Sequence, residues 1–390
     1  MANSERMTLA FINTAVLHGT CAANYVSVFR FLQQGKRVTG VACRDMLTGH
    51  EFEIRGKVVA NATGPFLSGM NSTIEGLKLR NQTTGFSKGV HMVTRQIHGH
   101  YALAISSGKK TEGYVSRGGR HIFIIPWRGR SLIGTTNVPF KDEIDNVTVS
   151  RKDVEDFVAD INTTLPGLNL CISDVQFAFA GLYPLFSDEI KEDTYQGTGE
   201  YQVVDHAEMD DVEGIVSVLG AKYTTARAVA EQAVDMIVAK LGLPHKPCST
   251  RSEPLFEGRI ADMESFVLQK TKQYGDIVRK EVIKNLIVNH GSDIDALMTH
   301  LRAGNGFFEK ISPERETLAG EVDYAVREEM ACTLADVIFR RTGMGTIGHP
   351  GEEVLLRVAE IMGETLGWTK DRIDREIETV NRNYQWVAAL

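Results

Sequence analysis

The chain has 390 residues, of which 43% are hydrophobic and 24% charged, a composition typical of a globular protein with two or three domains. Its formal charge is -7 and no stretch concentrates lysine and arginine, so nucleic acid has little electrostatic reason to bind. No segment offers the roughly 20 consecutive apolar residues that span a bilayer, so a helical membrane protein is not expected.

The first part of the chain combines one helix with short strands. Residues 5–18 place side chains at the spacing of one helix face. Strands are expected at 25–31, 37–44 and 51–55, joined by polar turns that contain glycine. Residues 57–65 form a short apolar run that ends in small residues. This last pattern predicts a fully buried strand that stops beside a ligand.

The middle of the chain is rich in expected strands. Residues 121–135 predict a hairpin around the turn Arg128-Gly-Arg130. Residues 150–165 predict an amphipathic helix, with Ser150 as N-cap and Asp153 completing a capping box.

The last part of the chain becomes helical. Residues 186–200 are polar and predict an exposed loop. Residues 214–220 predict a buried strand, followed by a long helix that Thr224 or Thr225 can cap. Residues 258–390 have helical periodicity almost throughout, which predicts a separate α-helical domain.

The sharpest local pattern lies between this strand and the long helix, at Gly220, Lys222, Thr224 and Thr225. A glycine turn here brings together the N–H groups of a helix start, a lysine and two hydroxyls, which is a site for negative charge. An ordinary strand–helix corner with a surface lysine would give the same pattern. The residues alone therefore favour neither interpretation.

His91 is the histidine placed best for proton transfer. It precedes the apolar pair Met92-Val93, so we expect it to be half-buried at the start of a strand. A histidine that titrates near neutral pH suits removal of a proton from an alcohol, although a histidine in such a place is more often structural. His98 and His100 lie close together, but two histidines without a third ligand make a weak metal site, and we expect no metal.

Residues 343–348, Gly-Met-Gly-Thr-Ile-Gly, match the G-x-G-x-x-G dinucleotide fingerprint. That fingerprint needs a strand before it and a helix that opens inside it. Here residues 335–341 predict a helix, and the next helix begins only near Pro350. We therefore interpret the motif as a helix–helix loop rather than as a nucleotide site.

Five groups of short motifs are spread along nearly the whole chain. They are Ala60-Asn-Ala-Thr-Gly-Pro65, Lys88-Gly-Val-His91, Ile125-Pro-Trp127 with Gly134-Thr-Thr-Asn137, Leu219-Gly-Ala-Lys-Tyr-Thr-Thr225 with Arg227, and residues 321–326 and 334–342. Together they resemble the FAD-dependent glycerol-3-phosphate dehydrogenase and oxidase family, including its K-G-x-H, I-P-W … G-T-T-D and G-G-K-x-T-T-x-R motifs. The resemblance covers nearly the whole chain, and the combination is specific although each motif is modest.

The resemblance implies an α/β (α+β) fold. A partial FAD-binding doubly wound domain would comprise residues 1–75 and 208–243, an inserted β-rich substrate domain residues 76–207, and a C-terminal all-helical domain residues 248–390. The family's opening strand and G-x-G-x-x-G segment has no counterpart in this sequence. We therefore expect the cradle for the FAD pyrophosphate to lie outside this chain, and whether the chain retains FAD is left open.

The resemblance also implies a reaction. The family oxidises the secondary alcohol of glycerol 3-phosphate to dihydroxyacetone phosphate, with hydride passing to flavin N5, and delivers the electrons to quinone or to oxygen. His91 would be the base and a substrate contact, and Lys222 would be a cation beside the substrate phosphate or the flavin. The implied FAD contacts are Ala62, Thr63, Gly64, Gly220, Lys222, Thr224 and Thr225.

Two substitutions alter the implied substrate site. The family motif S-G-x-R-P-L appears as Ala180-Gly-Leu-Tyr-Pro-Leu185, so Tyr183 stands where an arginine would bind the substrate phosphate. A later family arginine falls at Gly199. Tyrosine and glycine cannot replace the bidentate, charge-assisted contacts of arginine. We expect a phosphate site that is remodelled or weak around Tyr183, with Arg117, Arg120 or Arg128 as candidates to compensate.

Three interpretations stay open: oxidation of glycerol 3-phosphate, a related flavin oxidoreductase for another hydroxy or amino substrate, and a non-catalytic fragment that binds no flavin. The five cysteines are dispersed without a C-x-x-C pair, which predicts a reducing, cytoplasmic location. Peripheral contact with the inner membrane face is left open. Residues 258–390 are also a candidate partner or homodimer interface.

Overall fold

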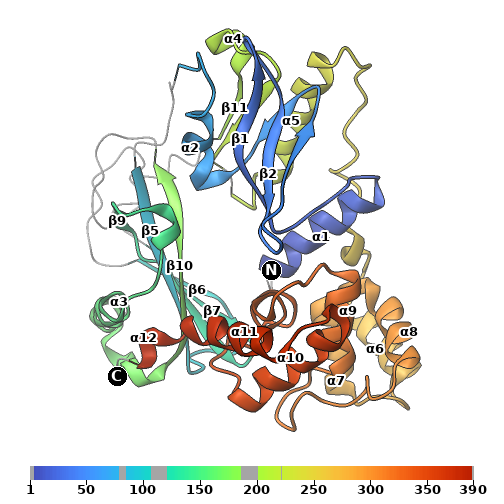
Figure 1. Cartoon of the computed structure of the whole chain (residues 1–390). Helices are drawn as coiled ribbons and strands as arrows, with labels where there is room; N and C mark the ends of the chain where they lie inside the picture. Colours follow the sequence, from blue (N-terminus) through green and yellow to red (C-terminus); the bar gives the residue numbers. More distant parts are fainter. Residues whose placement is uncertain (1–3, 79–84, 107–120, 186–200, 221, 389–390) are drawn as a thin grey trace.

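The computed structural model describes residues 4–78, 85–106, 121–185, 201–220 and 222–388. Within these residues the strands form three sheets, and the C-terminal part is helical (Figure 1). Arg117, Arg120, Gly199 and the loop expected at 186–200 lie outside the described residues. None of the helices in these ranges has the length and apolar character that crossing a membrane requires.

Two three-stranded sheets build the upper half of the molecule in Figure 1. One is antiparallel, with the order β1 (Val26–Gln34), β2 (Arg37–Asp45) and β3 (Glu51–Arg55). The other has the order β11 (Gln202–Asp205), β12 (Ile215–Leu219) and β4 (Val59–Asn61), with β12 and β4 parallel.

The expectation of a fully buried strand at 57–65 was wrong for β4. This strand has only three residues, and its central Ala60 is exposed. The physical reason is that β4 lies at the edge of its sheet within the described residues, so one of its sides has no strand partner. An apolar run alone does not reveal such a position.

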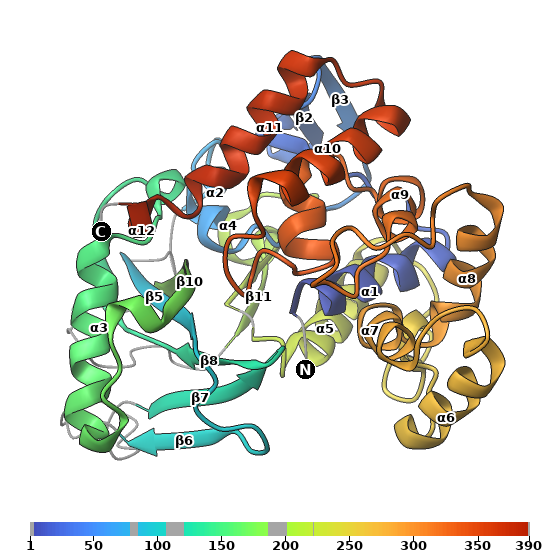
Figure 2. The ribbon, with the colours of Figure 1, turned by 90° about the horizontal axis from the view of Figure 1, so that it is seen from below.

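The third sheet is antiparallel, with the order β10 (Val175–Leu185), β5 (Gly85–Thr94), β8 (Arg130–Gly134), β7 (His121–Trp127) and β6 (Leu103–Ser106), while β9 (Val138–Phe140) pairs with β5. Helix α3 (Arg151–Thr164) covers one face of this sheet (Figure 2). The helix begins at Ser150 with the expected capping box to Asp153. Its apolar stripe buries Val154, Phe157, Val158 and Ile161 against Ile122, Ile124 and Ile133.

The other helices flank these sheets. They are α1 (Ser4–Leu17), α2 (Leu67–Asn71), α4 (His206–Asp210), α5 (Ala226–Lys240), α6 (Met263–Tyr274), α7 (Lys280–His290), α8 (Ile294–Ala303), α9 (Ala319–Glu328), a π-helical turn (Asp336–Arg341), α10 (Glu352–Leu366), α11 (Lys370–Arg382) and α12 (Gln385–Ala388). The C-terminal helices share one hydrophobic core with the third sheet, because Val93 and Phe177 pack in the same cluster as Val337, Val358 and Val380. The expected C-terminal helical domain therefore packs directly against the third sheet.

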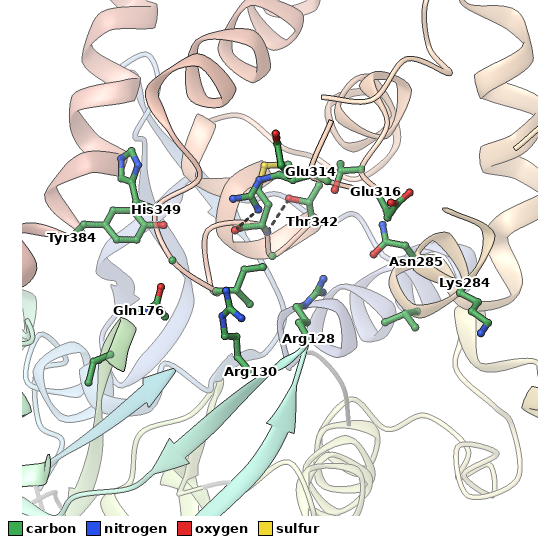
Figure 3. A pocket seen from close by; sticks show the side chains of 18 of the residues that line it. Arg128, Arg130, Gln176, Lys284, Asn285, Glu314, Glu316, Thr342, His349 and Tyr384 are labelled. Carbon is green, nitrogen blue, oxygen red and sulfur yellow. Dashed lines mark hydrogen bonds between the residues drawn. The ribbon is translucent and has the colours of Figure 1, made fainter. Parts of the chain in front are cut away.

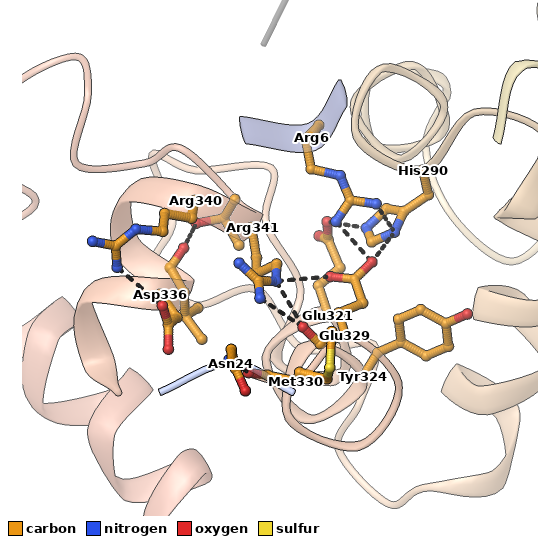
Figure 4. A network of polar contacts seen from close by, with 12 residues as sticks. Arg6, Asn24, His290, Glu321, Tyr324, Glu329, Met330, Asp336, Arg340 and Arg341 are labelled. Atoms are coloured by element: carbon orange, nitrogen blue, oxygen red, sulfur yellow. Dashed lines mark hydrogen bonds and ion pairs between the residues drawn. The ribbon is translucent and has the colours of Figure 1, made fainter. Parts of the chain in front are cut away.

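A buried ion network joins α1 to the C-terminal helices (Figure 4). The guanidinium of Arg6 donates to Glu329 at 2.7 Å and to Glu257 at 2.9 Å. His290 lies 3.3 Å from Glu329 and 3.6 Å from the carboxylate of Glu321. Each of these groups depends on its partners, since removing one member of a buried ion pair leaves a charge without compensation.

Candidate active site

His91 lies in the interior of β5, not at the start of a strand as the sequence suggested. Lys88, on the same strand, reaches Asp153 of α3 with an Nζ–Oδ2 distance of 2.7 Å. Because side chains alternate along a strand, His91 projects from the opposite face, away from α3. The imidazole stacks on Phe179 of β10, with ring centroids 5.2 Å apart and planes inclined by 6°. Burial lowers the pKa of His91, so the ring is neutral near pH 7 and can accept a proton.

Glycines beside His91 give its ring room. Gly134 of β8 is its cross-strand partner, and a Cβ at Gly134 would lie 1.9 Å from the ring carbon Cδ2. Only glycine therefore allows the imidazole to lie flat across β8. Gly89 and Gly181 face each other one cross-strand pair further along the same face. They keep this part of the sheet surface shallow, as a ligand that lies flat on it would need.

Tyr183 is on the same face as His91. It lies four residues beyond Phe179 on β10, where it pairs with Ser87, and its side chain is partly buried. The aromatic rings of Phe123 and Phe179 on this face are 46% and 42% exposed. The structure thus brings two of the three predicted substrate residues, His91 and Tyr183, to one open, largely apolar surface, whereas Lys222 lies between β12 and α5. Lys88 of the K-G-x-H motif faces the other way.

The two expected cofactor loops follow the carboxyl ends of two neighbouring parallel strands, β4 and β12. β4 and β12 are parallel, with Asn61 beside Ser217, so the segments after both strands emerge at the same edge. This edge, outside the carboxyl ends of parallel strands, is where ligands bind in open α/β sheets. Ala62, Thr63 and Gly64 follow β4 and are exposed, and Gly220, with φ of 61°, begins the turn after β12.

A buried polar network fixes the first of these loops. The amide of Asn61 donates to Asn71 at 2.8 Å and accepts from the hydroxyl of Thr63 at 2.7 Å. Asn71 in turn donates to Ser217 at 3.2 Å. The network continues from Ser217 to His206 and from there to Asp210, at 2.8 and 2.7 Å. Buried polar groups that bond one another in this way hold a loop in one conformation.

The second loop is closed by its own backbone. The carbonyl of Lys222 accepts the N–H groups of Thr225 and Ala226 at 3.0 and 2.9 Å. Thr225 occupies the N-cap position of α5, but its hydroxyl donates to the Lys222 carbonyl and does not cap the helix. The expected threonine cap is therefore wrong in its bonding, because a turn carbonyl competes for the hydroxyl. Thr224 is exposed beside it.

The loop after β4 also contacts the sheet that carries His91. The 3-10 turn Gly64–Phe66 packs against β10, the strand of Phe179 and Tyr183. Lys222 lies in the loop between β12 and α5, so it reaches this region from the sheet of β11, β12 and β4. Among the described residues, no group of three or more His, Cys, Asp or Glu side chains is placed to hold a metal ion.

Comparison with known proteins shows the family of this chain. Residues 1–236 match the model of the FAD dependent oxidoreductase family, and residues 248–373 match the C-terminal domain of alpha-glycerophosphate oxidase. The glycerol-3-phosphate dehydrogenase of Synechocystis sp. is 30% identical over 96% of this chain and 68% of its own length. The chain belongs to the FAD-dependent glycerol-3-phosphate dehydrogenase family.

Other members of the family show the same extent of similarity. The mitochondrial glycerol-3-phosphate dehydrogenase of Homo sapiens is 29% identical over 97% of this chain, which spans 51% of that protein. The glycerol-3-phosphate dehydrogenase of Bacillus halodurans, solved in complex with FAD, superposes with a TM-score of 0.79 at 26% identity, over 98% of this chain and 73% of that one. The chain thus spans about half the length of the mitochondrial relatives, and its fold is that of the family.

Sequence reasoning missed two contributors to this site. The network residues Asn71, Ser217 and His206 carry no motif, and Asn71 and Ser217 are 146 positions apart. The role of Gly134 was also missed, although the glycine stands in the quoted hairpin motif. The available signal was a glycine at the end of a predicted strand, where a neighbouring strand could place the side chain of His91.

Proposed function

We propose that this chain carries the oxidation of glycerol 3-phosphate to dihydroxyacetone phosphate by FAD. The observation that supports it most directly is the position of the His91 imidazole, stacked on Phe179 and beside Gly134 on an open face. A base in this position can take the hydroxyl proton while the carbinol hydrogen leaves as hydride. Family membership supplies the substrate and the cofactor of the proposal.

The residues present suit FAD. Two exposed loops meet at the carboxyl edge of β4 and β12, and the start of α5 favours negative charge there. Ala62, Thr63 and Gly64 would hold one side of the flavin region, and Gly220, Lys222, Thr224 and Thr225 the other. Bound FAD supplies N5 as the hydride acceptor. The chain's own part is to orient the alcohol, remove its proton at His91 and place the cation of Lys222.

Tyr183 supports a second candidate function. A tyrosine on the His91 face offers a hydroxyl but no positive charge, so it favours a substrate whose group at that point is uncharged. The alternative is therefore a flavin oxidoreductase for a non-phosphorylated hydroxy or amino substrate. Replacing Tyr183 by arginine separates the two, because Tyr183→Arg should lower KM for glycerol 3-phosphate only if the phosphate binds there.

The test uses the chain purified with excess FAD and freed of unbound flavin. Anaerobic glycerol 3-phosphate should bleach the visible flavin absorbance, and His91→Gln should retain flavin but reduce it about 10²–10⁴-fold more slowly. Bound flavin that stays oxidised with glycerol 3-phosphate but bleaches with another alcohol or an amine would favour the alternative. A chain that retains no flavin would refute the proposal for these residues alone.

The electron acceptor is part of the same proposal. Reduced flavin would pass its electrons to quinone or to oxygen, and oxygen uptake measured with and without a soluble quinone distinguishes these. The cytoplasmic location, the homodimer and the peripheral membrane contact expected from the sequence stay predictions.

A further inference from the structure

A cavity of about 1010 Å³ opens between the tip of the β7–β8 hairpin, α7 and the loop after the π-helical turn (Figure 3). Its volume is at the upper end of ordinary small-molecule sites, which run from about 300 to 1,000 Å³. The cavity reaches only the first two residues of β10, Val175 and Gln176, whereas His91 stacks on Phe179. Three residues of strand, about 10 Å, therefore separate it from the proposed active site.

Arg128, at the tip of the hairpin, lines this cavity without an anionic partner. Its guanidinium donates to the neutral amide oxygen of Asn289 at 3.1 Å, and its Nε is buried with no hydrogen-bond partner. Among the described residues, no carboxylate forms an ion pair with it. Burial lowers the pKa of Arg128, and the carboxylates of Glu321 and Glu5, which form no ion pair with it, offset this only in part. Such a charge is costly unless an anion completes the site.

The backbone holds Arg128 there against its own preference. Arg128 has φ of 46° and Gly129 has φ of 72°, the left-handed pair of a two-residue hairpin turn. Asparagine, aspartate and glycine suit the first of these positions, and arginine does not. The turn therefore places a guanidinium in the cavity although arginine disfavours this backbone conformation.

The G-x-G-x-x-G loop forms one wall of the cavity. Three of its six N–H groups are used within the structure, since Met344 donates to the Thr342 hydroxyl, Gly345 to the Ile338 carbonyl and Thr346 to the Gly343 carbonyl. The loop connects the π-helical turn, rather than a strand, to α10, in agreement with its interpretation as a helix–helix connection. Gly343 instead admits the arginine, because a Cβ there would lie 3.1 Å from Nη2 of Arg128.

A second guanidinium lies against the next residue of this loop. Arg315 donates to the carbonyl of Met344 at 3.0 Å, one position after Gly343. Glu316, one of the two carboxylates that line the cavity, is already paired with Arg279 and Lys310. The lining therefore has an excess of positive charge in a chain that is acidic overall.

We propose that this cavity binds the phosphate of a small phosphorylated metabolite between Arg128 and Arg315, separately from the substrate at His91. Two planar guanidinium forks that lie against consecutive residues of one loop, Gly343 and Met344, suit the several oxygens of a phosphate better than the two oxygens of a carboxylate. Arg130 and Lys284 also line the cavity (Figure 3) and would contact the part of the ligand beyond its phosphate.

Inorganic phosphate is the probe, with tryptophan fluorescence as the readout. Trp127 lies beside the site, since the guanidinium carbon of Arg128 is 5.7 Å from its ring centroid. Phosphate should change the fluorescence of the chain, while acetate at equal ionic strength should not, and Trp127→Phe should remove the change. Arg128→Asn should weaken phosphate binding about tenfold or more. The matched control is Arg55→Gln, an exposed arginine of β3 paired with Glu53, which should bind phosphate as the wild type does.

Folding can be separated from binding in this experiment. Asparagine suits the left-handed turn, so Arg128→Asn should melt in chloride no lower than the wild type. Undiminished phosphate binding by Arg128→Asn would overturn the proposal, and so would an equal response to acetate. A phosphate response lost in His91→Gln but kept in Arg128→Asn would place the anion at the proposed active site instead. Because no flavin is needed, the result does not depend on the proposed oxidation.

Discussion

The replacement Gly134→Ala tests how the structure positions His91. An added Cβ would lie 1.9 Å from Cδ2 and 2.3 Å from Nε2 of the imidazole, whereas ordinary contacts begin at 3.4 Å. The ring would have to move by about 1.5 Å, the difference between 3.4 and 1.9 Å. It cannot move toward Phe179, because that ring stacks against it. A misplacement of about 1 Å costs roughly 10²-fold in rate, so flavin reduction by Gly134→Ala should be at least about 10²-fold slower.

Anaerobic stopped-flow reduction of bound flavin measures this rate. Flavin content should be unchanged, since Gly134 belongs to β8 and to neither of the loops proposed to bind FAD. Gly167→Ala is the control, because a Cβ at Gly167 meets nothing within 4 Å. The double variant with His91→Gln should be no slower than His91→Gln alone, as expected for two changes that act through one group. Reduction by Gly134→Ala at the wild-type rate would refute the positioning argument.

Three further predictions concern protonation and the buried ion network. Because burial lowers the pKa of His91 below the ordinary histidine value of about 6.5, kcat/KM should stay flat down to that pH and fall only in more acidic solution. Arg6→Met should lower the free energy of unfolding in urea by about 3–5 kcal/mol, since Glu329 and Glu257 lose their shared cation. Although burial lowers it, Glu321 and Glu329 raise the pKa of His290 to about 9. The stabilisation from a raised pKa is complete below the unfolded-state pKa of about 6.5 and is lost as pH rises to the folded-state value. The urea midpoint of unfolding should therefore fall between pH of about 6.5 and about 9, and it should fall less in His290→Gln.

The elements that the sequence predicted well are those whose causes are local. The helix from Ser150 was placed to within a residue because its capping box and apolar stripe are both written in consecutive residues. The hairpin around Arg128 followed from its turn and two apolar runs in the same way. Such features need no knowledge of what packs against them.

The errors arose where distant residues decide the outcome. β4 was expected to be fully buried, but its place at a sheet edge depends on which strands pair with it. Thr224 or Thr225 was expected to cap a helix, but the hydroxyl of Thr225, at the N-cap position, donates instead to the carbonyl of Lys222 three residues earlier. His91 was expected at a strand start, and the length of β5 before it comes from pairing with β9 and β10. Pairing partners of this kind are tertiary facts that propensity cannot supply.

The C-terminal helices gain a structural role from α1. Arg6 ties this helix to Glu329 and Glu257 of the helical part, and Thr8, two residues later, bonds the hydroxyl of Tyr223 at 2.7 Å. Tyr223 follows Lys222 in the loop proposed to meet the flavin. Because one short helix contacts both, loss of the buried ion network should loosen that loop as well as lower stability. Arg6→Met should therefore release FAD more readily than Arg55→Gln does, which would connect the helical part to the proposed flavin loop through α1.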